Sequence, residues 1–391
     1  MIRGTTVTGP CAALACILAL WAGAAAAKEG PEEAVRRALE ANRTAADYRT
    51  WMQNAYAPHR LVARWARAGE SRQRAACDTL ARLSDSQLEL FEQALLLSEN
   101  ALPPCRAALL ERLAAVRLKP LSPPPPAAAG RYGIMQDGRR HCPGNPKALG
   151  TARVMEVAPA RTYGSLQGFA RLHLEPGELV FTFDDGPLPP VTGRVLAALE
   201  KHCVRATFFS VGRMASVYPD VLRRVQALGH VIGNHTWNHT VLTRLGLKAA
   251  VTHIEKGRAE IDRVLSVSRH AWLPGSKAGV APFFRFPGLG HNRKLIAHVK
   301  GRGTSVFSCD ICIDDWKQYS DEVLLKLALK EVEKHGRGIV LLHDIQRRTA
   351  RILPALLDAL AAKGYRAVHM VPQGWISTPA PRPAAQTVAG D

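Results

Sequence analysis

After residue 27, the sequence has no apolar run long enough to cross a bilayer. It also has no internal repeat and no stripe of basic residues interleaved with aromatic side chains. These absences argue against a membrane-spanning body, a repeat array and a DNA- or RNA-binding protein. With 47% apolar and 22% charged residues among 391, the chain has the composition of one large globular domain or two smaller ones.

Acidic residues are the scarcer charged type, 33 against 52 basic ones, which leaves a net charge of +19. Residues 28–119 hold 15 basic and 12 acidic side chains, whereas residues 120–391 hold 36 and 21. The positive charge therefore belongs mainly to the second part of the chain, where it would attract an anionic polymer or an envelope surface. A compositional bias is the alternative, since 38 of the 52 basic residues are arginine.

The N-terminus has the pattern of a secretory signal peptide. Arg3 is followed by an apolar stretch from Cys11 to Ala27, and three alanines precede Lys28 as a small-residue cleavage site. The sequence predicts a signal peptide over 1–27 and export to the periplasm, the cell envelope or the extracellular space. An uncleaved anchor helix is the alternative.

Six cysteines follow the predicted cleavage site, and an exported protein can form disulfides. Cys77 and Cys105 are the only two in the first region, so we predict that they pair. Cys309 and Cys312 have the spacing of a redox or zinc motif, but no second pair follows at the spacing of a zinc site. The partners of Cys142, Cys203, Cys309 and Cys312 stay open.

The composition divides the chain into regions. Residues 28–119 show apolar residues at helical spacing, with Ser84 or Ser86 as an N-cap, and predict a small bundle of about four helices of unknown function. Trp51, Tyr56 and Trp65 in this region fit core packing better than a sugar-stacking surface. A proline-rich linker is predicted over 120–130, a second domain over 131–376 with its core over 178–372, and a disordered tail over 377–391.

The second domain alternates short β-rich runs with amphipathic helices, whereas residues 131–175 read as irregular. Such alternation predicts an α/β fold of about seven parallel strands, closed or partly closed into a barrel, with a doubly wound open sheet as the alternative. The predicted strands are Leu179–Phe183, Ala206–Val211, His230–Ile232, Phe283–Phe286, Thr304–Cys309, Gly338–His343 and Tyr365–Met370. Five of the helices predicted between them are Thr192–His202, Pro219–Leu228, Ala249–Leu265, Asp321–His335 and Ala350–Lys363.

Polar residues follow several of these strands. Asp184 and Asp185 end the first strand, and His235 and His239 follow the third at a spacing that places both imidazoles on one face of a helical turn. Two histidines and one carboxylate, with other positions open, suit a catalytic Zn²⁺ or a similar divalent ion such as Co²⁺. Alone, the two histidines are weak signals, and the prediction depends on their meeting the aspartates.

Three further strand ends carry groups that complement such a site. Arg285 can hold a carboxylate in a bidentate contact, and His343 can act as a general acid. Asp314 or Asp315 can raise the pKa of an imidazole and orient it. Because parallel strands bring their carboxyl ends to one rim, we expect all of these side chains to converge there.

In their order along the chain, these segments resemble the five motifs of the polysaccharide deacetylases, carbohydrate esterase family 4, which share a homology domain with the nodulation chitooligosaccharide deacetylase. The resemblance covers about Leu179 to Met370. The five segments are Thr182–Gly186, His235–His239, Arg285–Gly288, Asp310–Trp316 and Leu341–His343. The combination is highly specific, and it implies a distorted (β/α) barrel.

The resemblance also implies a role for each residue. Asp185, His235 and His239 would bind the metal, with Asp184 as general base and Arg285 orienting it. His343 would be the general acid, tuned by Asp315. Leu341 would help to form the pocket for the acetyl methyl group, and Trp316 and Gly288 would line the substrate site.

Two features depart from the family pattern. Gly288 stands where an aromatic residue is common, which changes the cleft wall and leaves a backbone N–H for the oxyanion. Four residues separate Asp310 from Asp315, more than is usual, so the partner of His343 is either Asp314 or Asp315.

The implied activity is removal of N-acetyl groups from an N-acetylglucosamine polymer, with peptidoglycan favoured. The alternative substrates are a chitooligosaccharide, an exopolysaccharide or the O-acetyl esters of xylan. An alternative of another class is a non-catalytic carbohydrate-binding protein on the same scaffold. The native metal and the oligomeric state stay open.

Overall fold

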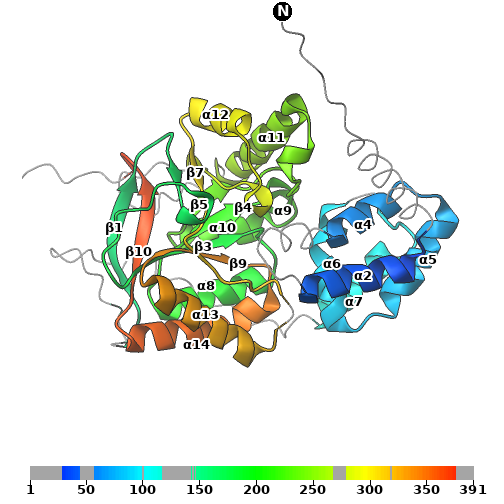
Figure 1. Cartoon of the computed structure of the whole chain (residues 1–391), viewed down its shortest axis with the longest axis horizontal. Helices are drawn as coiled ribbons and strands as arrows, with labels where there is room; N and C mark the ends of the chain where they lie inside the picture. The colour runs from blue at the N-terminus through cyan, green and yellow to red at the C-terminus, as the bar shows by residue number, and fades with distance from the viewer. Residues whose placement is uncertain are drawn as a thin grey trace, which may run out of the picture. The chain divides into compact units, whose positions relative to one another are not determined.

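The structure is a computed structural model that describes residues 29–44, 57–98, 101–116, 142, 145, 147–266, 279–317 and 319–375. The predicted signal peptide, the proline-rich linker and the C-terminal tail lie outside the described residues. The chain divides into two compact units, Met1–Val116 and Arg117–Asp391 (Figure 1). Among the described residues, no helix combines the length and the apolar character that a membrane crossing requires.

The first unit is helical, as predicted, and its described residues form five helices. These are α2 (Pro31–Thr44), α4 (Ala57–Trp65), α5 (Glu70–Ala81), α6 (Asp85–Leu97) and α7 (Arg106–Val116). Ser84 caps α6 in a capping box with Gln87. Trp65 stacks on Phe91 in the apolar core, at 6.5 Å between ring centroids. The predicted Cys77–Cys105 disulfide is confirmed.

The second unit is built on a parallel sheet. Its strands are β1 (Thr151–Val157), β2 (Thr162–Tyr163), β3 (Glu178–Asp184), β4 (Thr207–Ser210), β5 (Val231–Asn234), β6 (Phe283–Phe284), β7 (Ser305–Phe307), β8 (Ile311–Cys312), β9 (Gly338–His343) and β10 (Arg366–Pro372). The helices are α8 (Val191–Lys201), α9 (Gly212–Val217), α10 (Pro219–Ala227), α11 (Leu247–Ser266), α12 (Arg293–Gly301), α13 (Asp321–His335) and α14 (Arg347–Ala362). Every pairing between these strands is parallel, and crossover helices connect most of them (Figure 1).

Strand β3 occupies the centre of the sheet, and all seven of its residues are buried. Strand β9 pairs along one edge of β3, from Leu179 to Asp184. The other edge is shared by β10 at the start of β3 and by β4 at its end. The sheet continues through β5, β6 and β7 to β2, while β8 pairs with β9. The predicted α/β class and the distorted, barrel-like parallel sheet are confirmed.

The prediction of irregular chain over 131–175 is wrong for Thr151–Val157, which forms β1 beside β10. This strand is mostly half-buried, so its sequence lacks the continuous apolar run that identified β3. Strands β2 and β8 were not predicted either, because two residues are too short to show a period. Cys142–Cys203 and Cys309–Cys312 form the two disulfides whose pairing the sequence left open.

Side chains alternate between the two faces of β3. Val180 belongs to an apolar cluster with Phe209, Phe283 and Phe307. Thr182 and Asp184 follow Val180 on the same face, where the apolar cluster gives way to polar groups at the carboxyl end of the strand. The apolar cluster therefore packs directly beneath the polar site and supports it.

Candidate active site

Three side chains that can bind a metal, Asp185, His235 and His239, meet at the carboxyl ends of β3 and β5. One ligand atom from each lies within 4.8 Å of the other two, and all three residues are buried. Asp185 Oδ1 is 3.4 Å from His235 Nε2 and 3.1 Å from His239 Nε2. Residues from two segments about 50 positions apart in the chain thus converge on one point.

The hydrogen bonding of this cluster fits a divalent cation. His235 Nδ1 lies 2.8 Å from the carbonyl oxygen of Arg285, which can only accept, so Nδ1 carries a proton and Nε2 is the ring nitrogen that faces Asp185. Asp185 Oδ1 is buried and accepts no hydrogen bond from the described residues. A divalent cation bound between Oδ1 and the two Nε2 atoms would satisfy this buried oxygen. Two imidazole nitrogens and one carboxylate oxygen form the ligand set of a catalytic Zn²⁺ or similar ion.

The charge state of the cluster agrees with this reading. Burial favours the neutral acid, but the adjacent His239 and His235 imidazoles, with His343 nearby, hold the pKa of Asp185 well below its usual range. Asp185 is therefore a carboxylate at any physiological pH.

The cluster is held by backbone in a strained conformation. Asp185, Thr236 and His239 have φ values of 83°, 72° and 59°, in the left-handed region that side chains other than glycine avoid. Each such residue costs on the order of 1–3 kcal/mol and persists only where its surroundings impose it.

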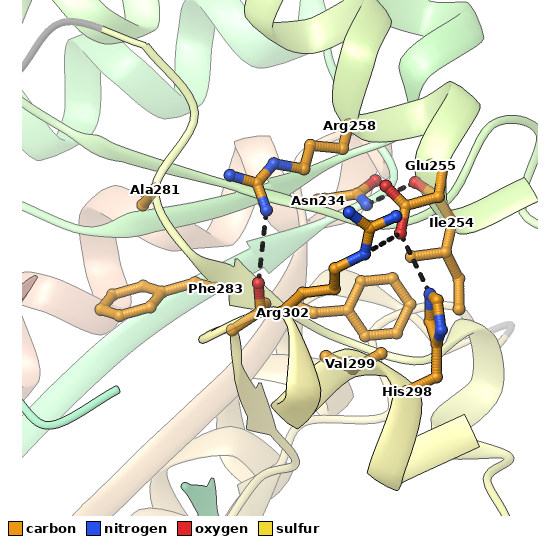
Figure 2. A pocket seen from close by; sticks show the side chains of 11 residues that line it. Asn234, Ile254, Glu255, Arg258, Ala281, Phe283, His298, Val299 and Arg302 are labelled. Carbon is orange, nitrogen blue, oxygen red and sulfur yellow. Dashed lines mark hydrogen bonds and ion pairs between the residues drawn. The ribbon is translucent and has the colours of Figure 1, made fainter. Parts of the chain in front are cut away.

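Helix α11 provides part of that support for the segment His235–His239. Asn234 donates from Nδ2 to the carbonyl oxygen of Ile254 at 2.9 Å (Figure 2). Its Oδ1 accepts from the backbone N–H of Thr236 at 2.9 Å. Trp237 N–H donates to the carbonyl oxygen of His253 at 2.9 Å. The segment that carries His235 and His239 is thus fixed to α11 at both Asn234 and Trp237.

Gly257 allows this close approach of α11. A Cβ added at Gly257 would lie 2.4 Å from the carbonyl carbon of Thr236, far inside contact distance. Beside Asn234, a cavity of about 20 Å³ lies between α11 and α12 (Figure 2). Glu255 on α11 forms ion pairs across it with His298 at 3.0 Å and Arg302 at 3.3 Å. The cavity has room for about one water molecule, so it is not a sugar-binding site.

Asp184 points from the same face of β3 as Thr182. Arg285 Nη1 donates to Asp184 Oδ1 at 2.7 Å and to Thr182 Oγ1 at 2.8 Å, and the guanidinium stacks on Phe209 at 4.3 Å from the ring centroid. Arg285 is fully buried, and its Nη2 also donates to the carbonyl oxygen of Ser308 at 2.9 Å. Asp184 Oδ1 is therefore engaged, whereas Oδ2 faces the cluster of Asp185, His235 and His239, at 3.8 Å from His235 Nε2.

His343 ends β9 directly opposite Asp184 in the register of the two strands. Its Nδ1 lies 2.7 Å from Asp315 Oδ1, and its backbone N–H donates to Asp315 Oδ2 at 2.8 Å. Burial disfavours the charged imidazole, but Asp315 outweighs it, with Asp185 and Asp184 adding to the effect, and raises the pKa of His343 to about 10. Asp314 instead pairs with Lys317 at 2.7 Å, so the structure brings Asp315, not Asp314, to the imidazole.

The three predicted substrate-binding residues lie on segments of the same rim. Leu341 precedes His343 by two residues on β9, so both side chains share a face. Trp316 directly follows Asp315 and is 8% exposed, with Lys317 Nζ 5.3 Å from its ring centroid. Gly288 has a φ of 56° in the turn after Arg285. Their contact with a substrate stays a prediction.

Several residues that shape the site were not predicted from the sequence. Thr182 was placed in the first motif without a role of its own, and Asn234 lay beyond the predicted strand His230–Ile232. Gly257 was an ordinary position of the predicted helix Ala249–Leu265. Asp344 follows His343 and is 1% exposed. An acidic residue directly after the apolar run Ile339–Leu342 and His343 was a usable signal for Asp344, whereas only the packing of α11 identifies Gly257.

Comparison with known proteins agrees with the site. A family profile described as polysaccharide deacetylase matches residues 173–306. The chain is 30% identical over 223 residues to the peptidoglycan-N-acetylmuramic acid deacetylase PdaC of Bacillus subtilis, a match that covers 57% of this chain and 44% of PdaC. It thus spans less than half the length of this relative.

Two other matches cover nearly all of the compared protein. The chitooligosaccharide deacetylase of Azorhizobium caulinodans is 30% identical over 210 residues, which cover 50% of this chain and 94% of that protein. The structure of a peptidoglycan deacetylase from Bdellovibrio bacteriovorus aligns with a TM-score of 0.65 and 28% identity, and covers 89% of this chain and 99% of that one. The chain therefore belongs to the polysaccharide deacetylases, carbohydrate esterase family 4.

Proposed function

We propose that this protein is an exported, metal-dependent hydrolase that removes N-acetyl groups from N-acetylglucosamine residues of an envelope polysaccharide, with peptidoglycan as the favoured substrate. The proposal rests on the cluster of Asp185, His235 and His239 and on two groups beside it. These are the carboxylate of Asp184 and the imidazole of His343, which lie opposite each other in the register of β3 and β9. Amide hydrolysis needs a group that takes a proton from water and a group that gives one to the leaving nitrogen.

Asp184 is suited to take the proton. Because Arg285 holds Oδ1, the lone pairs of Oδ2 face the cluster, where an attacking water would lie. The buried guanidinium also fixes the carboxylate in one orientation, so little rearrangement is needed before reaction.

His343 is suited to give the proton. Asp315 accepts from Nδ1–H, so the second proton of the imidazolium sits on Nε2, which is left for the leaving amine. With the pKa of His343 raised to about 10, the imidazole is charged at neutral pH and becomes the acid when the C–N bond breaks. The products are acetate and a free amino sugar.

The residues Asp185, His235 and His239 would hold the metal, with zinc the ion that this donor set suits best. When bound, such an ion polarises the carbonyl of the acetyl group and lowers the pKa of water.

Two observations favour peptidoglycan. PdaC and the Bdellovibrio bacteriovorus protein are both named for peptidoglycan, and the second aligns over 89% of this chain. The net charge of +15 over residues 120–391, from 36 basic and 21 acidic side chains, suits an anionic wall. A chitooligosaccharide is the second candidate substrate, favoured by the Azorhizobium caulinodans relative that the match covers almost completely.

Acetate release from a panel of substrates tests the proposal. The panel is peptidoglycan, chitooligosaccharides, poly-N-acetylglucosamine and acetylated xylan, each with the native protein, after chelation, and after Zn²⁺ is restored. We expect the highest turnover on peptidoglycan, its loss on chelation and its return with Zn²⁺. Mass spectrometry of the digested wall then identifies the sugar, since PdaC is named for N-acetylmuramic acid. Undiminished turnover by metal-depleted protein would reject metal dependence, and faster turnover of chitooligosaccharides would select the second candidate.

A further inference from the structure

Asp344 is a buried carboxylate that the proposed chemistry does not use. It directly follows His343 and is 1% exposed. Its Oδ1 accepts from the backbone N–H of Gly186 at 3.0 Å, and its Oδ2 accepts from Thr192 Oγ1 at 2.7 Å. Both carboxylate oxygens are thus directed at the segment that follows the two site aspartates.

These contacts bracket Asp185 in the chain. The backbone N–H of Asp344 donates to the carbonyl oxygen of Asp184 at 3.3 Å, and its side chain binds Gly186 on the other side. Asp185 lies between these two contacts, in the left-handed conformation with a φ of 83°. A residue in this region needs its neighbours fixed, because the conformation is unfavourable by itself.

Steric fit at Gly186 is as specific as the hydrogen bonds. A Cβ added at Gly186 would lie 2.0 Å from Asp344 Oδ2, so the carboxylate occupies the space that any other side chain would need. Thr192, at the start of α8, is fully buried and extends the contact, since its Oγ1 accepts from the backbone N–H of Leu188 at 2.8 Å. One carboxylate and one hydroxyl therefore fix the turn from Asp184 to Leu188.

The charge of Asp344 is unfavourable at this place. Burial, together with the nearby Asp185 carboxylate, raises the pKa of Asp344 to about 7, although Thr192 and Gly186 partly offset this. A neutral side chain would be easier to bury. The hydrogen bonds that this carboxylate makes to Gly186 and Thr192 therefore offer the explanation for an aspartate at this position.

We propose that Asp344 is a positioning residue that sets the metal affinity of the site by holding Asp185 in its ligand conformation. The inference rests on the proposed metal-dependent function. Asp344 would act through the backbone of Asp184 and Gly186, which it contacts, rather than as a metal ligand.

Zinc affinity of the purified full-length protein, measured by competition with a chromogenic chelator, tests this. We expect Asp344→Ala to weaken Zn²⁺ binding by about 10- to 100-fold, the usual effect of losing a group that orients a ligand. Asp344→Asn should recover most of the affinity, because its amide oxygen can still accept from Gly186 N–H. Thr192→Val, which removes one partner of the carboxylate, should fall between the two.

Asp310 offers a matched control for lost stability. It is also a buried aspartate, and its carboxylate accepts from the backbone N–H groups of Ser165 at 2.8 Å and Ile339 at 2.9 Å, near the start of β9 rather than its end. Asp310→Ala should lower the melting temperature and leave zinc affinity unchanged. Equal losses of affinity in Asp310→Ala and Asp344→Ala would reduce Asp344 to a structural role and overturn the inference.

Asp185→Ala in the same series separates the two proposals. If Asp185→Ala binds Zn²⁺ as tightly as the native protein, the proposed metal site is wrong. If it loses Zn²⁺ while Asp344→Ala does not, only the role of Asp344 is wrong. If Asp344→Ala does not fold, Thr192→Val decides, and native affinity in that variant overturns the inference.

Discussion

Replacing Asp315 with asparagine keeps the shape of the group beside His343 and removes its charge. Asp315 is fully buried, and it contacts both the ring and the backbone of His343, with Thr349 Oγ1 donating to its Oδ2. The single amide oxygen of asparagine can still accept from Nδ1–H and orient the ring, whereas its amide nitrogen replaces Oδ2 and loses the hydrogen bond from the His343 backbone N–H. The positive charge on the imidazole loses its nearest partner, and we expect the pKa of His343 to fall.

The sign of the effect on activity follows from the role of His343 as an acid. The acid must be protonated, so turnover falls as pH rises through the pKa of His343, which is about 10 in the native protein. Asp184 and Asp185 also raise the pKa of His343, but a cation bound at Asp185 would offset their negative charge. Asp315 would then be the main group that keeps His343 protonated. In Asp315→Asn the alkaline limb of the pH–rate profile therefore moves to lower pH.

The size of the effect depends on how far the pKa falls. At a pH above the new pKa, each unit by which the pKa of His343 falls lowers the protonated fraction of the imidazole tenfold. One pKa unit corresponds to a free energy of about 1.4 kcal/mol. The loss is bounded by the value of general acid catalysis, on the order of a hundredfold to ten-thousandfold. The deficit should be small in mildly acidic buffer and should grow steadily toward pH 9.

The assay is the pH profile of kcat/KM for acetate release, with Asp314→Asn as the matched control. Asp314 is the adjacent aspartate, and it pairs with Lys317 instead of His343. We expect Asp314→Asn to keep the native alkaline limb. An unshifted limb in Asp315→Asn, or an equal shift in both variants, would refute the assignment of His343 as the acid that Asp315 tunes.

Three further predictions concern the base and the metal. Asp184→Asn should abolish turnover and keep native zinc content by elemental analysis, because the ligands are untouched; turnover in this variant would remove Asp184 as the base. His235→Ala should lose bound metal sharply, and unchanged metal content would exclude His235 from the ligand set. Gly257→Ala should force α11 away from Thr236, which lies 2.4 Å from the added Cβ, and destabilise the protein by about 1–3 kcal/mol in thermal or denaturant unfolding, with weaker metal binding. Gly193→Ala, at a helix position with no atom within 4 Å of the added Cβ, is its control, and equal stability of the two variants would contradict the packing argument.

Short-range patterns in the sequence predicted much of this protein. The run Leu179–Phe183 is apolar except for the β-branched Thr182, and α13 has Ser320 as its N-cap and Gly336 at its end, so both elements were predictable from local signals. Parallel pairing followed from the alternation of strands and helices, and that pairing placed the polar strand ends on one rim. The location of the site at this rim could therefore be predicted without knowing any distance between residues far apart in the sequence.

The remaining features depend on contacts that no local pattern records. Asp314 and Asp315 are adjacent and chemically identical, and only the path of the chain after β8 directs Asp315 to His343. Asp344 gains its place from a glycine 158 residues earlier in the chain. The sequence by itself determined the chemistry available at each strand end, because residue types and spacing are local. The tertiary structure decided which of these groups meet, because burial, charge and steric fit are set by neighbours that are distant in sequence.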